Sequence, residues 1–323
     1  CLSDWSSDVC SSDLEQRLGR AQEAARKARR LKGWMAPCRV CPRECGVDRL
    51  CGESGLCHTP DRPAVASFGP DFDEESPLVG SGGAGTVRFA GCSLRCSYCQ
   101  DHEISQPADG HVDGQLVETE ALGMIFLALQ NRGCHNINLV TPSHVVPQIV
   151  EALAMAYADG LNIPIVYNCG GYENVDTLRQ LDGLIDIYLT DFKYGTSQQY
   201  SQAPGYVGVC REAVREMHRQ VGDLQINRRG VAQRGLMVRH MVLPGGLAGS
   251  REVARFLADE ISLDTWCTVT STYQPAHRAL RLPELNRTPS GWEVEAAREA
   301  FWQAGLHRLA VPPIARGSAS QLR

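Results

Sequence analysis

The sequence predicts a mixed α/β fold in which parallel strands alternate with helices, preceded by a small cysteine-rich segment. Two observations indicate this organisation. Six short β-rich runs alternate with segments of helical periodicity, and five cysteines crowd into a short stretch ahead of them. A chain of 323 residues, 43% of them hydrophobic, is long enough to bury a sizeable core. We therefore expect one large domain with a small appendage.

The predicted strands are short runs rich in β-branched and other apolar residues. They span Thr86–Ala90, Asn136–Val140, Pro164–Tyr167, Ile185–Leu189, Leu236–Leu243 and Trp266–Thr270. Strands that alternate with helices pair in parallel, as an open sheet or as a partial barrel. In both arrangements the functional residues gather at the carboxyl ends of the strands.

Apolar residues between these strands recur with helical spacing. One example is the set Leu122, Ile125, Phe126 and Leu129, at positions i, i+3, i+4 and i+7, and the pattern returns from Val146 onward. The periodicity therefore predicts amphipathic helices that cover the sheet.

The chain divides into four segments. Residues 1–14, rich in Ser and Asp, are typical of translated sequencing-adapter sequence or of a disordered tail, and we set them aside. Residues 15–85 contain a basic helix with a solvated face, the cysteine-rich segment and a linker rich in Pro, Gly and acidic residues. Residues 86–310 form the α/β core, and residues 311–323 form a tail.

Composition excludes several classes of protein. A net charge of −5 gives no argument for nucleic acid binding, and no apolar run approaches the roughly 20 residues of a membrane span. No secretory signal is visible, so we expect a cytoplasmic protein. Fourteen cysteines in a chain of this kind indicate metal or redox chemistry.

Cys92, Cys96 and Cys99 directly follow the first predicted strand, in the spacing Cys-x3-Cys-x2-Cys. Each iron of a [4Fe–4S] cluster needs a terminal ligand, and thiolates are the usual ones. Three cysteines on one loop can hold three irons and leave the fourth open, and an open position distinguishes a catalytic metal site from a closed one. The alternatives are buried structural cysteines, or zinc held by three cysteines and a distant histidine.

This motif resembles that of the radical S-adenosylmethionine (SAM) superfamily, and the chain is most similar to homologues of pyruvate formate-lyase activating enzyme. The shared phrases begin at Cys38 (CRVCPR), Phe89 (FAGC), Asn136 (NINLVTPSH), Val166 (VYN), Asp186 (DIYLTDFKY) and Val238 (VRH). The likeness extends from about Gly33 to Leu309. It implies a partial (β/α)6 radical SAM barrel behind the cysteine-rich segment.

The resemblance also implies an activity. Cys92, Cys96 and Cys99 would ligate a [4Fe–4S] cluster whose open iron chelates SAM. One electron passed through the cluster would cleave SAM reductively, and the resulting 5′-deoxyadenosyl radical would abstract hydrogen from a substrate. The target would be a small molecule or the glycine of a glycyl-radical enzyme. The electron donor would be a protein such as flavodoxin or ferredoxin.

Further residues match family positions around SAM. The resemblance places Tyr98 and Gln100 near the adenine, and Asp191 and Lys193 near the ribose and carboxylate. Arg239 lies within a predicted strand, where an inward guanidinium could meet the carboxylate of SAM. The cofactor supplies the radical chemistry, and these residues would bind and orient it.

One departure from the family concerns the second strand, which usually ends in a Gly-Gly-Glu type motif that meets the SAM amino group. Here it ends in Thr141-Pro-Ser143-His144. The Thr141 or Ser143 oxygens, or a neutral His144, could accept hydrogen bonds from an ammonium group.

The amino-terminal cysteines predict a second metal site. Cys38-x2-Cys41 is a usual zinc knuckle, and tight cysteine spacings followed by Pro also occur in iron–sulfur loops. The resemblance implies Cys38, Cys41, Cys45 and Cys57 as the ligand set and leaves Cys51 outside it. Zinc and a second cluster remain equal candidates, with free thiols as the alternative.

Two rival functions belong to other classes. A non-catalytic iron–sulfur protein, an electron carrier or redox sensor, would keep the cluster without productive SAM binding. A zinc-dependent binding module would hold zinc in place of iron.

Overall fold

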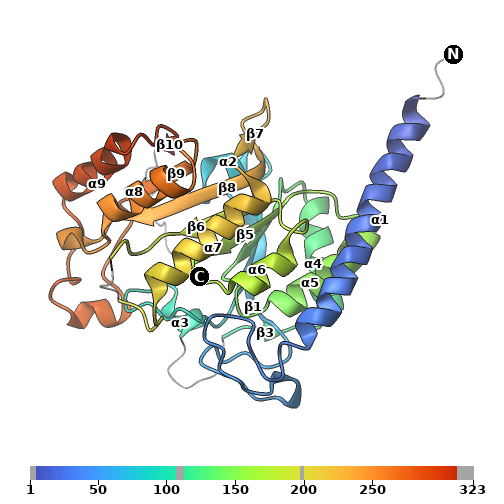
Figure 1. The fold of residues 1–323 in the computed structure, drawn as a ribbon. Helices are drawn as coiled ribbons and strands as arrows, with labels where there is room; N and C mark the ends of the chain where they lie inside the picture. The colour runs from blue at the N-terminus through green and yellow to red at the C-terminus, as the bar shows by residue number, and fades with distance from the viewer. Residues whose placement is uncertain (1–4, 107–112, 197–199, 311–323) are drawn as a thin grey trace, which may run out of the picture.

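The structure, a computed structural model, describes residues 5–106, 113–196 and 200–310, with side chains from residue 14 onward. The expected carboxyl-terminal tail, 311–323, lies outside the described residues. Helices and strands alternate along the chain, and the helices cover the sheet (Figure 1).

A mostly parallel sheet forms the centre of the molecule. In the described part of the chain its strands are ordered β10-β9-β8-β6-β5-β4-β2-β1-β3, with β7 beside β8. The bounds are β1 Ala64–Asp71, β2 Ala84–Phe89, β3 Gln115–Leu116, β4 Ile137–Val140, β5 Ile165–Cys169, β6 Ile187–Asp191, β7 Gln225–Ile226, β8 Ala232–Met241, β9 Trp266–Thr270 and β10 Leu309–Ala310.

The six predicted strands are β2, β4, β5, β6, β8 and β9, which follow one another in parallel. Most of their side chains are buried, which explains why their sequences read as short apolar runs rather than as polar–apolar alternation. The prediction of an α/β fold with a parallel sheet is therefore confirmed.

Helices connect these strands as the periodicity predicts. Their bounds are α1 Trp5–Lys32, α2 Ser76–Val79, α3 His102–Ser105, α4 Thr119–Asn131, α5 Val146–Ala158, α6 Val175–Leu181, α7 Tyr206–Val221, α8 Ser250–Glu260 and α9 Gly291–Gln303. Short 3₁₀ turns span Arg49–Cys51, Pro244–Gly246 and His277–Arg281. No helix among the described residues has both the length and the apolar character needed to cross a membrane.

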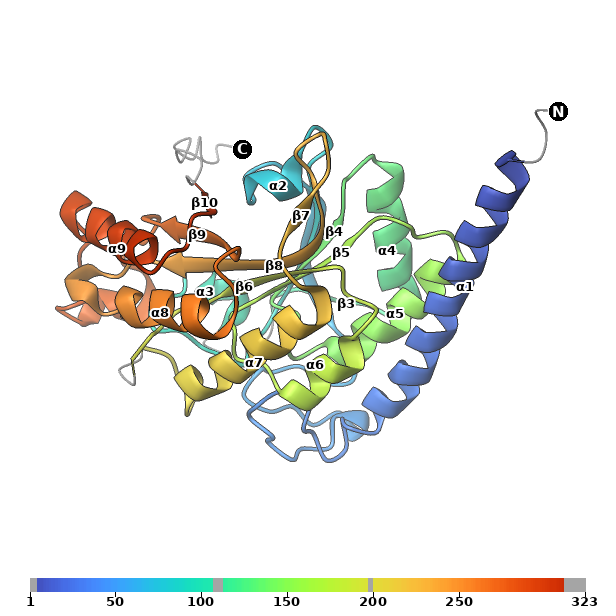
Figure 2. The same ribbon diagram turned by 45° about the horizontal axis from the view of Figure 1, so that its top comes forward.

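Helix α1 differs from the sequence expectation in two respects. It begins at Trp5, inside the stretch set aside as a tail. It also packs along α5 at the edge of the molecule (Figure 2), so it is not only a solvated basic helix. Its buried face carries Ala24 and Leu31, and Arg20 pairs with Asp186 at 3.1 Å. Small apolar residues alternating with basic ones let one face pack while the other stays in water.

The expected linker also differs. Part of it forms β1, which pairs antiparallel with β2 from Val65↔Phe89 to Asp71↔Ala84. The acidic turn that follows β1 carries Glu74 and Glu75 into the interior of the fold. Charged residues of this kind read as solvated linker in the sequence, because their buried partners lie on distant strands.

Candidate functional site

The cysteine loop begins where β2 ends. Gly91, with φ +82°, turns the chain, and a Cβ there would come within 2.3 Å of the Cys57 carbonyl oxygen, so only glycine fits. The Leu94 N–H donates to Cys92 Sγ at 3.4 Å, and Cys99 Sγ lies 3.2 Å from Ser105 Oγ. Burial raises the pKa of the Cys92, Cys96 and Cys99 thiols. They therefore stay protonated unless a bound metal displaces the protons.

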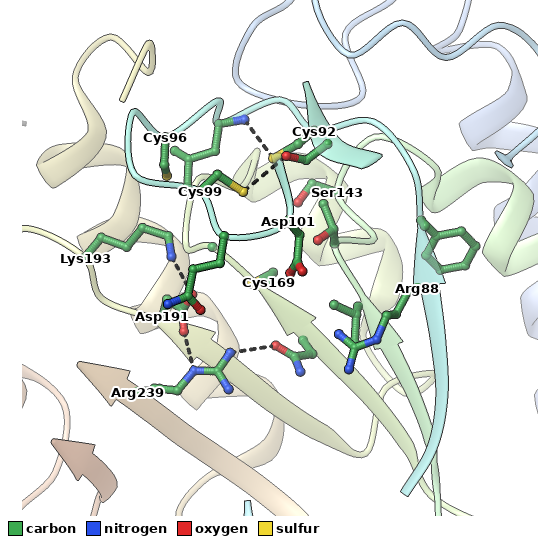
Figure 3. A pocket seen from close by; sticks show the side chains of 18 of the residues that line it. Arg88, Cys92, Cys96, Cys99, Asp101, Ser143, Cys169, Asp191, Lys193 and Arg239 are labelled. Atoms are coloured by element: carbon green, nitrogen blue, oxygen red, sulfur yellow. Dashed lines mark hydrogen bonds and ion pairs between the residues drawn. The ribbon is translucent and has the colours of Figure 1, made fainter. Parts of the chain in front are cut away.

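These three cysteines lie at one end of a cavity of about 380 Å³ (Figure 3). The carboxyl ends of several parallel strands supply the other walls. Its polar lining includes Asp71, Asp73, Glu74, Arg88, Ser93, Gln100, Asp101, Thr141, Ser143, Asn168, Glu173, Asp191, Lys193, Arg239, Thr270 and Thr272. The strand topology thus brings the loop and the predicted strand-end residues to one place.

A charged network crosses the cavity wall from β6 to β8. Lys193 Nζ donates to Asp191 Oδ2 at 2.6 Å, and Arg239 Nε donates to Asp191 Oδ1 at 2.7 Å. Burial alone would raise the pKa of Asp191, but the two cations lower it to about 2. Asp191 is therefore ionised throughout the physiological range, and both cations face the cavity with their positions fixed.

Arg239 also reaches a deeper acid from the β1–α2 turn. Its Nη1 donates to Glu74 Oε1 at 3.1 Å, and its Nη2 donates to Asn168 Oδ1 at 3.3 Å. Asn138 and Asn168 each donate an amide N–H to Glu74 Oε2, at 3.2 and 2.8 Å. Every charged group in this network has a partner of opposite charge, which is the condition for charges to be tolerated inside a fold.

Tyr98 and Gln100, the two residues expected near the adenine of SAM, differ in burial. Tyr98 is buried against Tyr273 and Tyr194 in edge-to-face contacts, with centroids 5.6 and 6.3 Å apart. Gln100 is exposed at the cavity rim and donates to the Thr272 carbonyl at 3.2 Å. Both line the cavity, so the structure brings them to the three cysteines.

The Thr141–His144 segment is brought only partly to the cavity. Thr141, with φ +60°, and Ser143 line it, and a positive φ is strained for a β-branched residue. His144 faces away: it is buried, its Nε2–H donates to the Ala90 carbonyl at 2.9 Å, and burial lowers its pKa to about 4. His144 therefore does not line the cavity that holds the other predicted SAM contacts.

Sequence reasoning missed several lining residues, above all Glu173, Glu74 and Arg88. Glu173 follows the carboxyl end of β5, where a search of strand ends would have found it. Glu74 lies in an acidic turn with no recognisable signal, and Arg88 lies inside β2 and pairs with Asp71 at 2.9 Å. Only the folded chain brings these two into the cavity.

The amino-terminal cysteines surround a second, much smaller hollow. Cys38, Cys41, Cys45 and Cys57 all line a space of about 10 Å³. Cys51 does not line it and lies exposed beside Asp48. Burial, and then the neighbouring Cys57 and Cys38 thiols, raise the pKa of Cys41 to about 12. The four cysteines implied as a set are therefore neighbours in space.

Two arginines line the same hollow. Arg49 is fully buried, and its guanidinium donates to the Pro60 carbonyl at 2.8 and 3.0 Å and to the His144 carbonyl at 2.7 Å. No described carboxylate forms an ion pair with it. Arg43, also in the lining, donates from Nε to the Ser93 carbonyl at 2.8 Å. Arg49 is thus a buried cation whose printed partners are backbone carbonyls, so its charge is not balanced by a described carboxylate.

The two cysteine regions adjoin each other. Ser93 lines both the cavity and the hollow, and the Cys57 carbonyl packs against Gly91. Arg43 ties the amino-terminal segment to the backbone of the cysteine loop. Displacement of one region would therefore disturb the other.

Among the described residues, no three or more His, Cys, Asp or Glu side chains are gathered as ligands of a single metal ion. The thiolates of a [4Fe–4S] cluster each bind a different iron, so they need not converge on one point. The donor set of the loop, three thiols at the end of a cavity with Lys193 nearby, fits such a cluster. The four amino-terminal thiols line one hollow beside two arginines, but they do not form such a single-ion group.

Comparison with known proteins finds a similar protein whose own activity is not assigned. No family model matches the chain. The chain is similar to an uncharacterized protein of Methanocaldococcus jannaschii, with 27% identity over 266 residues that cover 81% of this chain and 73% of the relative. This likeness assigns neither a family nor a function.

Proposed function

We propose that this protein is a radical SAM enzyme on a partial (β/α)6 barrel. One observation carries the proposal: the three thiols of the Cys92–Cys99 loop line the same cavity as the charged strand ends Asp191, Lys193 and Arg239. A loop that only stored a metal would not need a cavity walled by buried, fixed charges. When bound, the cluster would supply the electron that cleaves SAM into methionine and a 5′-deoxyadenosyl radical for hydrogen abstraction.

The chain's own residues bind and orient the cofactor. Cys92, Cys96 and Cys99 hold three irons. Lys193 and Arg239 present N–H donors to an anionic group, and Asp191 keeps both in place. The apolar ring of Tyr98 forms part of the wall and excludes water from the reacting end.

The amino-terminal hollow is proposed as a metal site held by Cys38, Cys41, Cys45 and Cys57. The support is the buried Arg49, whose positive charge an anionic metal–thiolate group would balance. Zinc or a second iron–sulfur cluster would both supply that charge. In either case the metal would stiffen a segment that has little regular structure of its own.

Partners follow from the same proposal. Reduction of the cluster needs an external electron donor such as flavodoxin or ferredoxin, and the substrate is a small molecule or a protein glycine. We propose a cytoplasmic location because thiol-bound clusters of this kind require a reducing compartment.

A non-catalytic iron–sulfur protein is the second candidate. The observation that favours it is His144, which turns away from the cavity and leaves the second strand end without one of its three predicted contacts. The intact Asp191–Lys193–Arg239 network favours the enzyme, since an electron carrier has no need of it.

Electron paramagnetic resonance on anaerobically reconstituted, dithionite-reduced protein separates the two. We expect a [4Fe–4S]⁺ signal that changes shape when SAM is added, because SAM would occupy the open iron. A cluster signal that is indifferent to SAM would favour the electron carrier. A colourless protein that retains zinc and no iron would refute both and leave the zinc module.

A further inference from the structure

Glu173 is a buried carboxylate that the sequence did not single out. It lies beyond β5, is 3% exposed and lines the large cavity. Ser143 Oγ donates to its Oε1 at 2.5 Å, and Tyr167 Oη donates to its Oε2 at 2.8 Å. Two hydroxyls from two neighbouring strands thus fix the orientation of the carboxylate. The Cys169 thiol also interacts with this carboxylate by a side-chain hydrogen bond. A carboxylate has about four acceptor positions, so about one is left for a ligand.

No cation balances this carboxylate within the described part of the chain. Lys193 and Arg239, the cations of the opposite wall, are paired with Asp191 and Glu74. The titratable groups that interact with Glu173 are Tyr167, Cys169, Tyr188, Cys41 and Cys210, and burial raises the pKa of each. Tyr167, Cys169, Tyr188 and Cys210 are neutral at neutral pH, and so is Cys41 unless a bound metal displaces its proton. Glu173 is therefore the single ionisable charge of its surroundings, and burial raises its pKa to about 7.

We propose that Glu173, held by Ser143 and Tyr167, receives the ammonium group of the amino-acid portion of SAM. The proposal rests on the proposed function, and it gives the altered second strand a replacement for the acid that the family carries there. An ammonium group brings both the missing positive charge and an N–H donor for the open acceptor position. The sulfonium of SAM carries a positive charge but no N–H, so it could balance the charge of Glu173 without donating a hydrogen bond to it.

If Glu173 binds the ammonium group, affinity for SAM should depend on pH and on the presence of an amino group in the ligand. Only the ionised carboxylate attracts an ammonium, so affinity for SAM should fall by up to about tenfold per pH unit below pH 7. Binding of the ammonium should in turn lower the pKa of Glu173. A ligand without an amino group should show neither effect.

Equilibrium binding to the cluster-loaded protein tests this, with SAM and with 5′-methylthioadenosine as probes. Methylthioadenosine keeps the adenosine and the sulfur but lacks the ammonium and carboxylate. In Glu173→Gln we expect SAM to bind about 10- to 100-fold more weakly, the range for loss of a charged hydrogen bond, with methylthioadenosine unchanged. The pH dependence between about 7 and 5 should disappear. Glu103→Gln, an exposed acid on α3, is the matched control.

The outcomes separate this inference from the proposed function. If the unaltered protein binds no SAM, both fall. If it binds SAM and Glu173→Gln binds SAM equally well, or loses SAM and methylthioadenosine to the same extent, the inference alone is overturned. Should Glu173→Gln fail to fold, Glu173→Asp decides: it should weaken SAM binding while keeping the pH dependence, and a flat profile would overturn the inference.

Discussion

The two cysteine regions of this molecule adjoin each other and have different surroundings. The thiols of the Cys92–Cys99 loop lie at the end of a cavity of about 380 Å³ whose walls carry Asp191, Lys193 and Arg239. The thiols of the Cys38–Cys57 segment enclose about 10 Å³, and the charged groups beside them are arginines. The first region therefore has room for a bound molecule beside its thiols, whereas the hollow of the second is far smaller.

This comparison teaches that cysteine spacing predicts metal chemistry without predicting its use. An open site needs space and fixed charges around the thiols, while a closed site needs only ligands and charge balance. The open region draws its walls from six parallel strands, and the closed region is made from one irregular segment and its neighbours. Three variants can break or sharpen this division.

Cys96→Ala should have the largest effect. It removes one of three loop ligands, so we expect loss of about four irons per chain and of all SAM-dependent change in the paramagnetic signal. The fold should survive, because a buried Cys→Ala change removes a single sulfur atom. Iron analysis and circular dichroism check the two expectations. Retention of iron and of SAM cleavage would show that the loop is not the cluster site.

Cys41→Ala tests the closed region. We expect loss of the amino-terminal metal, easier chemical unfolding, and a SAM-responsive central cluster that remains intact. Cys51→Ala is the matched control, since that thiol lies in the same segment but outside the hollow. Metal content per chain and urea midpoints are the measurements. Loss of SAM cleavage with an intact central cluster would instead assign the closed region to electron relay.

Arg49→Met should have the smallest of the three effects. The change leaves the Pro60 and His144 carbonyls without their donor, which should lower the free energy of unfolding by about 3 kcal/mol. It also removes the charge that would balance a metal–thiolate group, so a chelator should strip the amino-terminal metal faster. Arg49→Lys should lose the forked hydrogen bonds yet keep the charge. Equal metal release from both variants would refute the charge argument.

Much of the fold could be predicted from local pattern. Six predicted runs correspond to β2, β4, β5, β6, β8 and β9. They are apolar because both faces of those strands are covered, and a short apolar run can be recognised from the sequence alone. β1 could not be recognised, since its carboxyl half is half-exposed and runs through Gly and Pro into acidic residues. Its strand character comes from pairing with β2.

The candidate site divides in the same way. Cys92 was found from the cysteine spacing at a recognisable strand end, and Asp191 and Lys193 were expected from the family resemblance. Glu74 was not found, since a lone acid in a turn carries no periodicity and no spacing, whereas Glu173 follows the end of β5 and could have been found there. Conversely, His144 stands at a strand end, yet its imidazole bonds to the Ala90 carbonyl and leaves the cavity. Side-chain direction depends on partners that the local sequence does not contain.

The sequence by itself determined the α/β class, the positions of six parallel strands along the chain and the two cysteine groups, because each depends on residues close together in the chain. Only the tertiary structure decided which thiols face a cavity, which acids reach its walls, and that Glu173 lies there without a cation. The physical reason is that burial and charge balance depend on which residues are neighbours in the folded protein. They are set by residues more than a hundred positions apart, such as Glu74 and Arg239, that meet only when the sheet forms.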